Sequence, residues 1–171
     1  MTGVQAPSAQ DRAAFVAAFG GVFEHSPWVA EAAFDAGLTE EADSAEGLHR
    51  LLCAAMRAGT KAQHEALIEA HPDLAGRLAR AGNLTADSTV EQASAGLDRL
   101  SDADYERFVA LNEAYRGKFG FPFIMAVKGS SKDEILAAFE QRLENDAESE
   151  FAEALAQIER IALLRLRDLL P

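Results

Sequence analysis

The chain has 171 residues, 49% of them hydrophobic, and a formal net charge of -12 at pH 7. Such a length and composition suffice for one domain with a substantial core, so we expect a single domain over residues 1–171 with a flexible start over residues 1–8. The strong negative charge opposes phosphate backbones and anionic membrane surfaces, so neither nucleic acid nor a membrane is expected as a partner.

The only cysteine, Cys53, lies in an apolar stretch, Leu51-Leu52-Cys53-Ala54-Ala55. A single thiol excludes an intrachain disulfide, and its apolar neighbours are more typical of a buried core residue than of a nucleophile. The first residues contain no basic segment followed by an apolar run, so no signal peptide is expected. These features favour a cytoplasmic protein.

Four helices are expected before residue 70, each marked by a local start or stop signal. In chain order, the signals are Ser8 with Gly20-Gly21, Ser26-Pro27 with Gly37, Asp43 with Glu46, and Thr60 with Gln63. Serine, threonine and aspartate are typical helix caps, and the pairs three residues apart have capping-box spacing. Glycine is the usual residue just after a helix end.

Further helices are expected after residue 71. Their expected bounds are Pro72 to about Arg80, Ser88 with Glu91 to Gly96, Ser101 to Gly117, Ser131 with Glu134, and Asn145 with Glu148. The sequence shows no internal repeat and no convincing strand pairing. The predicted fold class is therefore all-α, a single-domain bundle of about eight helices.

Residues 118–128, Lys-Phe-Gly-Phe-Pro-Phe-Ile-Met-Ala-Val-Lys, interrupt this helical pattern. Gly120 and Pro122 break a helix, yet nearly all the other residues are apolar. A buried irregular segment leaves backbone N–H and C=O groups that need partners, and a ligand is one way to supply them. A short core strand or connector is the alternative, and periodicity does not separate the two.

His71 precedes a proline, which places it at a helix junction. Pro72 disfavours α geometry in His71 and suits the first position of a helix, so His71 is expected at the N-cap of the helix that follows. The N–H groups and positive dipole end of that helix would disfavour an imidazolium and favour a nearby anion, which suits proton transfer. An ordinary turn between two helices is the alternative.

Arg165 falls on the apolar face of the last predicted helix. That face repeats at steps of four and three residues: Phe151, Leu155, Ile158, Ala162, Arg165 and Leu169. A guanidinium cannot lose its charge, so at a buried position it needs an anionic partner, either a carboxylate of the protein or a ligand. Extension of the side chain to the rim of the core is the alternative.

Several chemistries are poorly supported. His64 and His71 are separated by seven positions, no metalloprotease helix motif occurs, and no metal site is expected. No serine lies in a nucleophile-elbow motif, and no glycine-rich phosphate loop is present. What remains is acid/base chemistry without a cofactor on a small anionic substrate. The candidates are His71, Glu91, Arg165 and the backbone amides of residues 123–127, with His25, Gln92 and Asn112 as secondary polar groups. The residues alone leave the reaction open.

Seven segments, taken together and in order, resemble the 2-oxo-4-hydroxy-4-carboxy-5-ureidoimidazoline (OHCU) decarboxylase family. They are Phe23-Glu-His-Ser-Pro-Trp28, His71-Pro-Asp-Leu-Ala-Gly76, Ser88-Thr-Val-Glu-Gln92 with Ala95-Gly-Leu97, Asn112 with Tyr115, Lys118-Phe-Gly-Phe-Pro-Phe-Ile124, Arg142-Leu143 with Asn145, and Ile161-Ala162 with Arg165-Leu166. The resemblance runs from about Phe15 to Leu170. It implies an all-helical, often dimeric lyase that decarboxylates OHCU to (S)-allantoin, without a cofactor, in urate (purine) catabolism.

The resemblance also implies roles for individual residues. His71 would be the catalytic acid/base, with Pro72 also at the site, and Glu91 would be the second catalytic group. Arg165 is the best match to the family's site arginine, and Arg142 is the less favoured one. The segments that would contact substrate are Ser88, Thr89, Val90, Glu91 and Gln92, and, mainly through the backbone, Phe123, Ile124, Met125, Ala126 and Val127.

Two alternatives stay open at this point. Glu91 lies three residues after Ser88, so it could be a capping partner, a catalytic group or both. In place of an enzyme, the chain could be a non-catalytic helical module that uses the aromatic residues of 119–123 to bind a peptide or a purine-like metabolite. If the enzyme reading holds, we expect a homodimer and functional coupling to urate oxidase and hydroxyisourate hydrolase.

Overall fold

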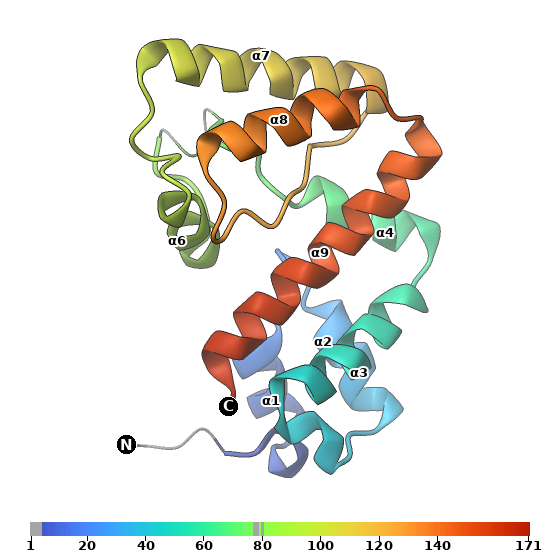
Figure 1. The fold of residues 1–171 in the computed structure, drawn as a ribbon. Coiled ribbons are helices and arrows are strands. Elements are labelled where there is room, and N and C mark those ends of the chain that lie inside the picture. Colours follow the sequence, from blue (N-terminus) through green and yellow to red (C-terminus); the bar gives the residue numbers. More distant parts are fainter. Residues whose placement is uncertain (1–4, 77–78, 80) are drawn as a thin grey trace. The chain divides into compact units, whose positions relative to one another are not determined.

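The computed structural model describes residues 5–76, 79 and 81–171. Over these residues the protein forms eight α-helices and two short 3-10 helices, Ala79 is also helical, and no strand is formed (Figure 1). The α-helices are α1 (Arg12–Phe19), α2 (Trp28–Ala36), α3 (Ala45–Arg57), α4 (Lys61–Glu69), α6 (Ala86–Ser94), α7 (Asp102–Phe119), α8 (Lys132–Leu143) and α9 (Ala147–Leu169). The all-α class with about eight helices is confirmed.

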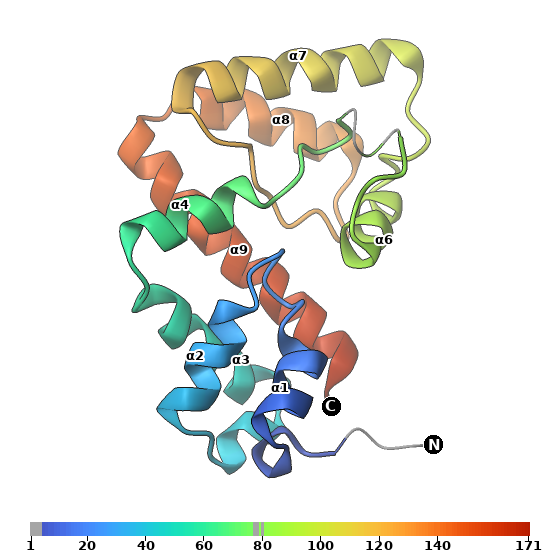
Figure 2. The ribbon, with the colours of Figure 1, turned by 180° about the vertical axis from the view of Figure 1, so that it is seen from behind.

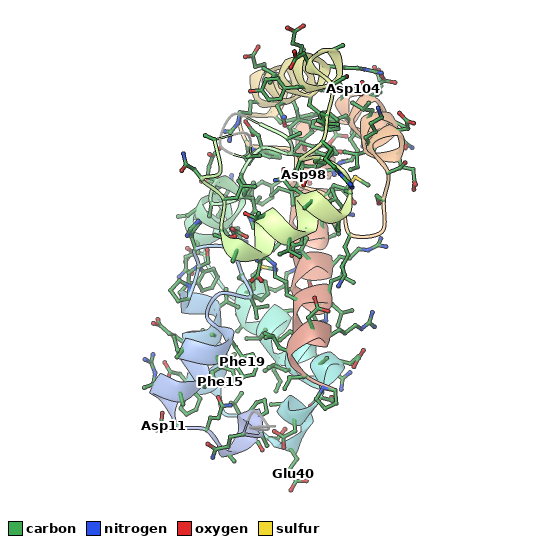
Figure 3. All side chains as sticks on the ribbon, turned by 90° about the vertical axis from the view of Figure 1, so that its left-hand side faces the viewer. Asp11, Phe15, Phe19, Glu40, Asp98 and Asp104 are labelled. Carbon is green, nitrogen blue, oxygen red and sulfur yellow. The ribbon has the colours of Figure 1, made fainter. Side chains whose placement is uncertain are left out.

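The helices group into two compact units. The first unit comprises Met1–Ala70 and Glu159–Pro171, and so contains α1 to α4 and the end of α9. In this unit α2 packs against both α1 and α3 (Figure 2). Phe15 and Phe19, which lie on α1 (Figure 3), are fully buried, and their ring centroids are 5.1 Å apart. The Phe15 ring also lies 5.7 Å from that of Phe34 on α2, so aromatic packing joins α1 to α2.

The second unit comprises His71–Ile158, with α6, α7, α8 and the first part of α9. Helices α7 and α8 lie side by side in this unit (Figure 1). Its core is one apolar cluster formed by Leu74, Ala75, Ala95, Leu97, Phe108, Tyr115, Phe123, Val127, Ile135, Leu136 and Phe139. At its centre the rings of Phe123 and Phe139 stack with centroids 3.7 Å apart. The core thus joins residues of the irregular segment to α7 and α8.

Two of the predicted capping boxes are confirmed. Thr60 accepts a hydrogen bond from the amide of Gln63, whose side chain in turn accepts one from the amide of Thr60. Ser131 and Glu134 make the same reciprocal pair at the start of α8. Both helices therefore begin where the sequence predicts.

Other helix starts are shifted from the prediction. Asp11, not Ser8, caps α1, because the Ser8 amide and hydroxyl donate to Asp43 at 2.8 and 2.7 Å. Asp43 is thereby engaged, and Ser44 caps α3 in its place. Ser8 lies in a 3-10 helix, Pro7–Ala9, whereas residues 1–4 of the predicted flexible start lie outside the described residues.

The second unit shows similar shifts. Thr85 caps α6, so Ser88 lies inside that helix, and the Ser88–Glu91 capping box is wrong. Helix α7 continues past Gly117 and ends at Gly120, whose φ of 80° suits a left-handed helix end. Asp146 accepts the amide hydrogen bond at the start of α9, because Asn145 donates instead to Glu150. Where several capping residues are adjacent, long-range contacts decide between them.

Candidate functional site

The residues after His71 form a tight turn, so the helix predicted over residues 72–80 does not begin at Pro72. None of residues 72–76 is helical, whereas Ala79 is, and residues 77, 78 and 80 of the predicted helix lie outside the described part of the chain. Ala75 has a φ of 51°, and the amide of Gly76 reaches back to the carbonyl of Asp73 at 3.4 Å. A Cβ at position 76 would lie 2.8 Å from the Asp73 Cβ, so this turn needs glycine there.

Three side chains from α6 and α7 hold the turn in place. Gln92 accepts a hydrogen bond from the Ala75 amide, and Asn112 donates one to the Leu74 carbonyl, each at 2.9 Å. The guanidinium of Arg116 pairs with Asp73 at 3.1 Å. These long-range bonds use backbone groups that a helix would otherwise employ, which explains why the local helix signal fails. Of these three side chains, Gln92 and Asn112 are among the polar residues predicted for the site, and Arg116 is not.

His71 begins this turn with only 6% of its surface exposed. The dipole argument for its protonation state does not apply, because no helix begins at Pro72. Pro72 itself is partly buried beside it. The imidazole is therefore shielded from bulk water on a backbone fixed by hydrogen bonds, which is the setting that positioned proton transfer requires.

Helix α6 separates the five predicted substrate residues onto different sides. Ser88 and Gln92 are buried, each 5% exposed, and Glu91 is partly buried beside them. Thr89 is exposed and its hydroxyl donates to the Thr85 carbonyl, whereas Val90 is 68% exposed. Five consecutive helical residues span more than a full turn, so only Ser88, Glu91 and Gln92 share one face.

A cavity of about 220 Å³ lies in the second unit against another side of α6. Its lining includes Thr89, Gln92, Leu97, Leu100 and Tyr105, but neither His71 nor Glu91. The cavity therefore brings Thr89 and Gln92 together without reaching the histidine.

The irregular apolar segment predicted at residues 118–128 is confirmed from Gly120 onward. It contains no strand, so the strand alternative is wrong, and Phe123, Ile124, Ala126 and Val127 are buried while Met125 is partly exposed. Protein side chains satisfy part of its backbone: Arg142 donates to the Ile124 carbonyl at 2.6 Å. Gln157 accepts from the Ala126 amide at 3.0 Å. Sequence reasoning gave no role to Gln157, and no local signal distinguishes it from other polar residues of α9.

Arg142 belongs to a buried polar network. Its Nε donates to Glu150 at 2.9 Å, and its Nη2 lies 2.8 Å from the same carboxylate without hydrogen-bond alignment. Tyr115 and Asn145 also donate to Glu150, at 2.5 and 2.9 Å. The guanidinium carbon lies 4.3 Å from the ring centre of Phe123. The Nε and Nη1 groups of Arg142 thus link the irregular segment to Glu150 on α9.

The pKa values in this network follow from burial and pairing. Burial raises the pKa of Glu150, but hydrogen bonds from Arg142, Tyr115 and Asn145 outweigh it, so the net pKa is below the ordinary range. Burial, and then the bond to Glu150, raises the pKa of the Tyr115 hydroxyl. Glu150 therefore stays ionised and Tyr115 stays a donor near neutral pH.

Arg165 lies in the first unit and is buried, with 6% of its surface exposed. Its Nη2 donates to Glu24 at 2.8 Å, and its Nη1 approaches the Val22 carbonyl at 3.3 Å. Glu24 is itself only 2% exposed. The alternative that the Arg165 side chain extends to the rim of the core is therefore wrong. The carboxylate of Glu24 supplies the anionic partner that a guanidinium on an apolar helix face requires.

Cys53 is buried in the first unit, as expected. Burial, and then the neighbouring Glu159, raises its pKa to about 12. The thiol therefore carries almost no thiolate near neutral pH, which is unsuitable for a nucleophile.

Among residues 5–76, 79 and 81–171, no three His, Cys, Asp or Glu side chains gather as a metal site would require. Within the part of the chain described, no helix combines the length and apolar character needed to cross a bilayer.

Comparison with known proteins identifies the family. A family model described as OHCU decarboxylase matches residues 8–167, which include all the predicted site residues. The chain belongs to the OHCU decarboxylase family. Within this family, a Halalkalicoccus jeotgali protein named 2-oxo-4-hydroxy-4-carboxy-5-ureidoimidazoline decarboxylase is 43% identical over 159 residues, which cover 93% of this chain and 86% of that protein.

Two further relatives are longer proteins. The uric acid degradation bifunctional protein PucL of Bacillus subtilis is 41% identical over 151 residues, which cover 88% of this chain and 29% of PucL. A crystal structure of (S)-allantoin synthase matches 98% of this chain and 54% of its own, with 34% identity and a TM-score of 0.75. The chain therefore corresponds to only part of each of these two proteins.

The Glu150 network predicts a specific dependence of stability on pH. Because the pKa of Glu150 is lowered in the folded state, its contribution is present above the unfolded carboxyl pKa of about 4.3 and is lost as pH falls through the folded value. Glu150→Gln should cost about 3 kcal/mol or more at neutral pH, because it leaves Arg142 buried without a carboxylate. It should also flatten the loss of stability below about pH 4.

Urea unfolding at neutral and acidic pH measures both effects. Glu106→Gln, at an exposed position of α7, is the matched control and should stay within about 0.5 kcal/mol of the parent protein. Parallel pH profiles for Glu150→Gln and the parent protein would contradict the assignment.

Proposed function

We propose that this chain decarboxylates OHCU to (S)-allantoin in urate catabolism, with His71 as the acid/base and without a cofactor. The observation that carries the proposal is the buried His71 at a turn fixed by Gln92 and Asn112, in a chain whose family match covers residues 8–167. The names of the relatives describe the same reaction pathway.

The structure of OHCU explains why such a site suffices. One ring carbon carries both a carboxylate and a hydroxyl, beside a C=N bond. That bond accepts the electron pair released as CO2 leaves, so the substrate contains its own electron sink. A site that holds the carboxylate out of the ring plane aligns the breaking bond with the C=N system. Protonation of the planar intermediate on one face then gives a single enantiomer.

His71 manages the hydroxyl proton in this proposal. A positioned acid/base contributes about 10²- to 10⁴-fold, so His71→Asn should lower kcat by that factor while the protein remains folded. His64→Asn is the matched control, because His64 bonds the Met56 carbonyl within the first unit and should affect stability alone. A folded His71→Asn protein with full turnover would refute the role.

The measurement generates the unstable substrate in place with urate oxidase and hydroxyisourate hydrolase and follows the circular dichroism of allantoin. Rapid formation of the (S) enantiomer by the parent protein supports the enzyme. Slow, racemic product at the rate without protein supports the non-catalytic binding module instead.

Glu91 is the second catalytic group in this proposal. Its alternative role as the partner of a Ser88 cap is removed, because α6 begins after Thr85. Glu91→Gln keeps the shape but removes the charge, so kcat should fall about 100-fold or more. The free energy of unfolding should change by no more than about 0.5 kcal/mol. Small, equal losses of turnover and stability would argue for a structural role.

Arg165 is proposed to orient the substrate carboxylate. The support is its guanidinium, which Glu24 and the Val22 carbonyl hold in a fixed orientation on an otherwise apolar helix face. Arg165→Lys keeps the charge but loses the planar fork, so kcat/KM should fall about tenfold or more. The exposed Arg160→Lys change on the same helix is the control. Unchanged kinetics in Arg165→Lys would shift the assignment away from this residue.

The remaining expectations are proposals about context. We retain one functional domain over residues 1–171, because the family match spans both compact units. A cytoplasmic homodimer is proposed with it, and sedimentation equilibrium at the mass of one chain would contradict the dimer. Functional coupling to urate oxidase and hydroxyisourate hydrolase is supported by the bifunctional PucL relative. Coupling would be supported if allantoin forms faster in the mixture of the three enzymes than the rates of the separate enzymes predict. An equal rate would contradict coupling.

A further inference from the structure

The irregular segment is held by one buried cation, and this arrangement has consequences for substrate binding. Arg142 is 8% exposed and lies in the second unit, as do residues 123–127. Its Nη1 donates to the Ile124 carbonyl at 2.6 Å, and its guanidinium stacks on the Phe123 ring at 4.3 Å. A charged hydrogen bond and a stacking contact therefore act on two consecutive residues of the segment.

The Arg142 guanidinium has little freedom to move. Glu150, which is fully buried, accepts from its Nε at 2.9 Å. Tyr115 and Asn145 donate to the same carboxylate and so fix its position. A carboxylate with several donors on one side of a planar guanidinium sets the direction of the remaining N–H groups. The bond to Ile124 is consequently aimed by the network and not by Arg142 alone.

The direction of this bond determines where the next amide points. All described peptide bonds are trans, so the Met125 N–H is directed opposite to the Ile124 carbonyl, away from Arg142. Gln157 already accepts the Ala126 amide hydrogen bond. No side chain or carbonyl of the described residues accepts one from Met125, which is partly exposed. Within residues 123–127 Met125 is the one residue that is partly exposed, so its amide is the one best placed to meet a ligand.

We infer that Arg142 is a positioning residue that orients the 124–125 peptide so that the Met125 N–H can donate to the anionic substrate. This inference rests on the proposed function. It gives Arg142 a role distinct from contact with substrate, because its donors are directed at Ile124 and Glu150. Loss of the bond to Ile124 frees the peptide to rotate and should weaken substrate binding more than it slows the chemical step.

A pair of variants separates this role from simple stabilisation. Glu150→Gln removes the buried counter-charge but keeps an oxygen that can accept from the Arg142 Nε, so the bond to Ile124 keeps its direction. Stability should therefore fall while KM stays within about twofold of the parent value. The double variant Arg142→Met with Glu150→Gln has no unpaired buried charge, so it should be more stable than Glu150→Gln. Its KM for OHCU should nevertheless rise about tenfold or more, with a smaller change in kcat.

Binding of (S)-allantoin by calorimetry gives a readout independent of turnover. Its dissociation constant should rise about tenfold in the double variant and stay near the parent value in Glu150→Gln. If the double variant does not fold, Arg142→Lys replaces it, because one ammonium cannot reach both acceptors in the geometry of the guanidinium fork. Arg142→Lys should raise KM with kcat nearly retained.

The possible failures are distinguishable. The positioning role alone would be overturned if the parent protein is active and the folded double variant keeps the parent KM and the parent affinity for (S)-allantoin. The same result in Arg142→Lys would overturn it equally. A KM that follows stability across all variants would overturn it as well. No turnover of OHCU by the parent protein would overturn the proposed function and the inference together.

Discussion

Hydrogen bonding of buried irregular backbone is the constraint on which the second unit depends. Two of its segments, residues 71–76 and 120–128, are largely buried without helical structure. A polar backbone group left without a partner at a buried position costs about 1–3 kcal/mol, so these segments need side chains that supply partners. Gln92 and Asn112 supply partners to the first segment, and Arg142 and Gln157 supply them to the second. The helices of the second unit thus carry the side chains that form hydrogen bonds to the backbone of these two irregular segments.

This arrangement suits chemistry that depends on position. A decarboxylation in which the substrate accepts its own electrons asks the protein for orientation and for one proton transfer. His71 stands at the start of a turn whose backbone is fixed at Leu74 and Ala75, so its placement does not rely on loop flexibility. The two buried arginines serve different purposes: Arg142 is engaged with backbone and Glu150, and Arg165 is held by Glu24. Preorganisation of this kind is set during folding.

Sequence reasoning predicted the features that local signals determine. The all-α class, the Thr60 and Ser131 capping boxes and the irregular segment after Gly120 all follow from nearby residues. It failed at Pro72, where partners 17 and 38 residues away along the chain compete with helix formation. Asn112 was predicted as a polar residue of the site, because a polar amide between Phe108 and Tyr115 on one helix face needs a partner, but its partner, the distant Leu74 carbonyl, has no local signal.

Amide hydrogen exchange at Ala75 and Ala126, measured by NMR, tests most directly whether side chains hold these segments. The account predicts that both amides are protected to a degree similar to core helix amides. It further predicts that Gln92→Leu removes protection at Ala75 while Ala126 remains protected. Exchange of Ala75 in the parent protein at the rate of an exposed loop amide would contradict the account.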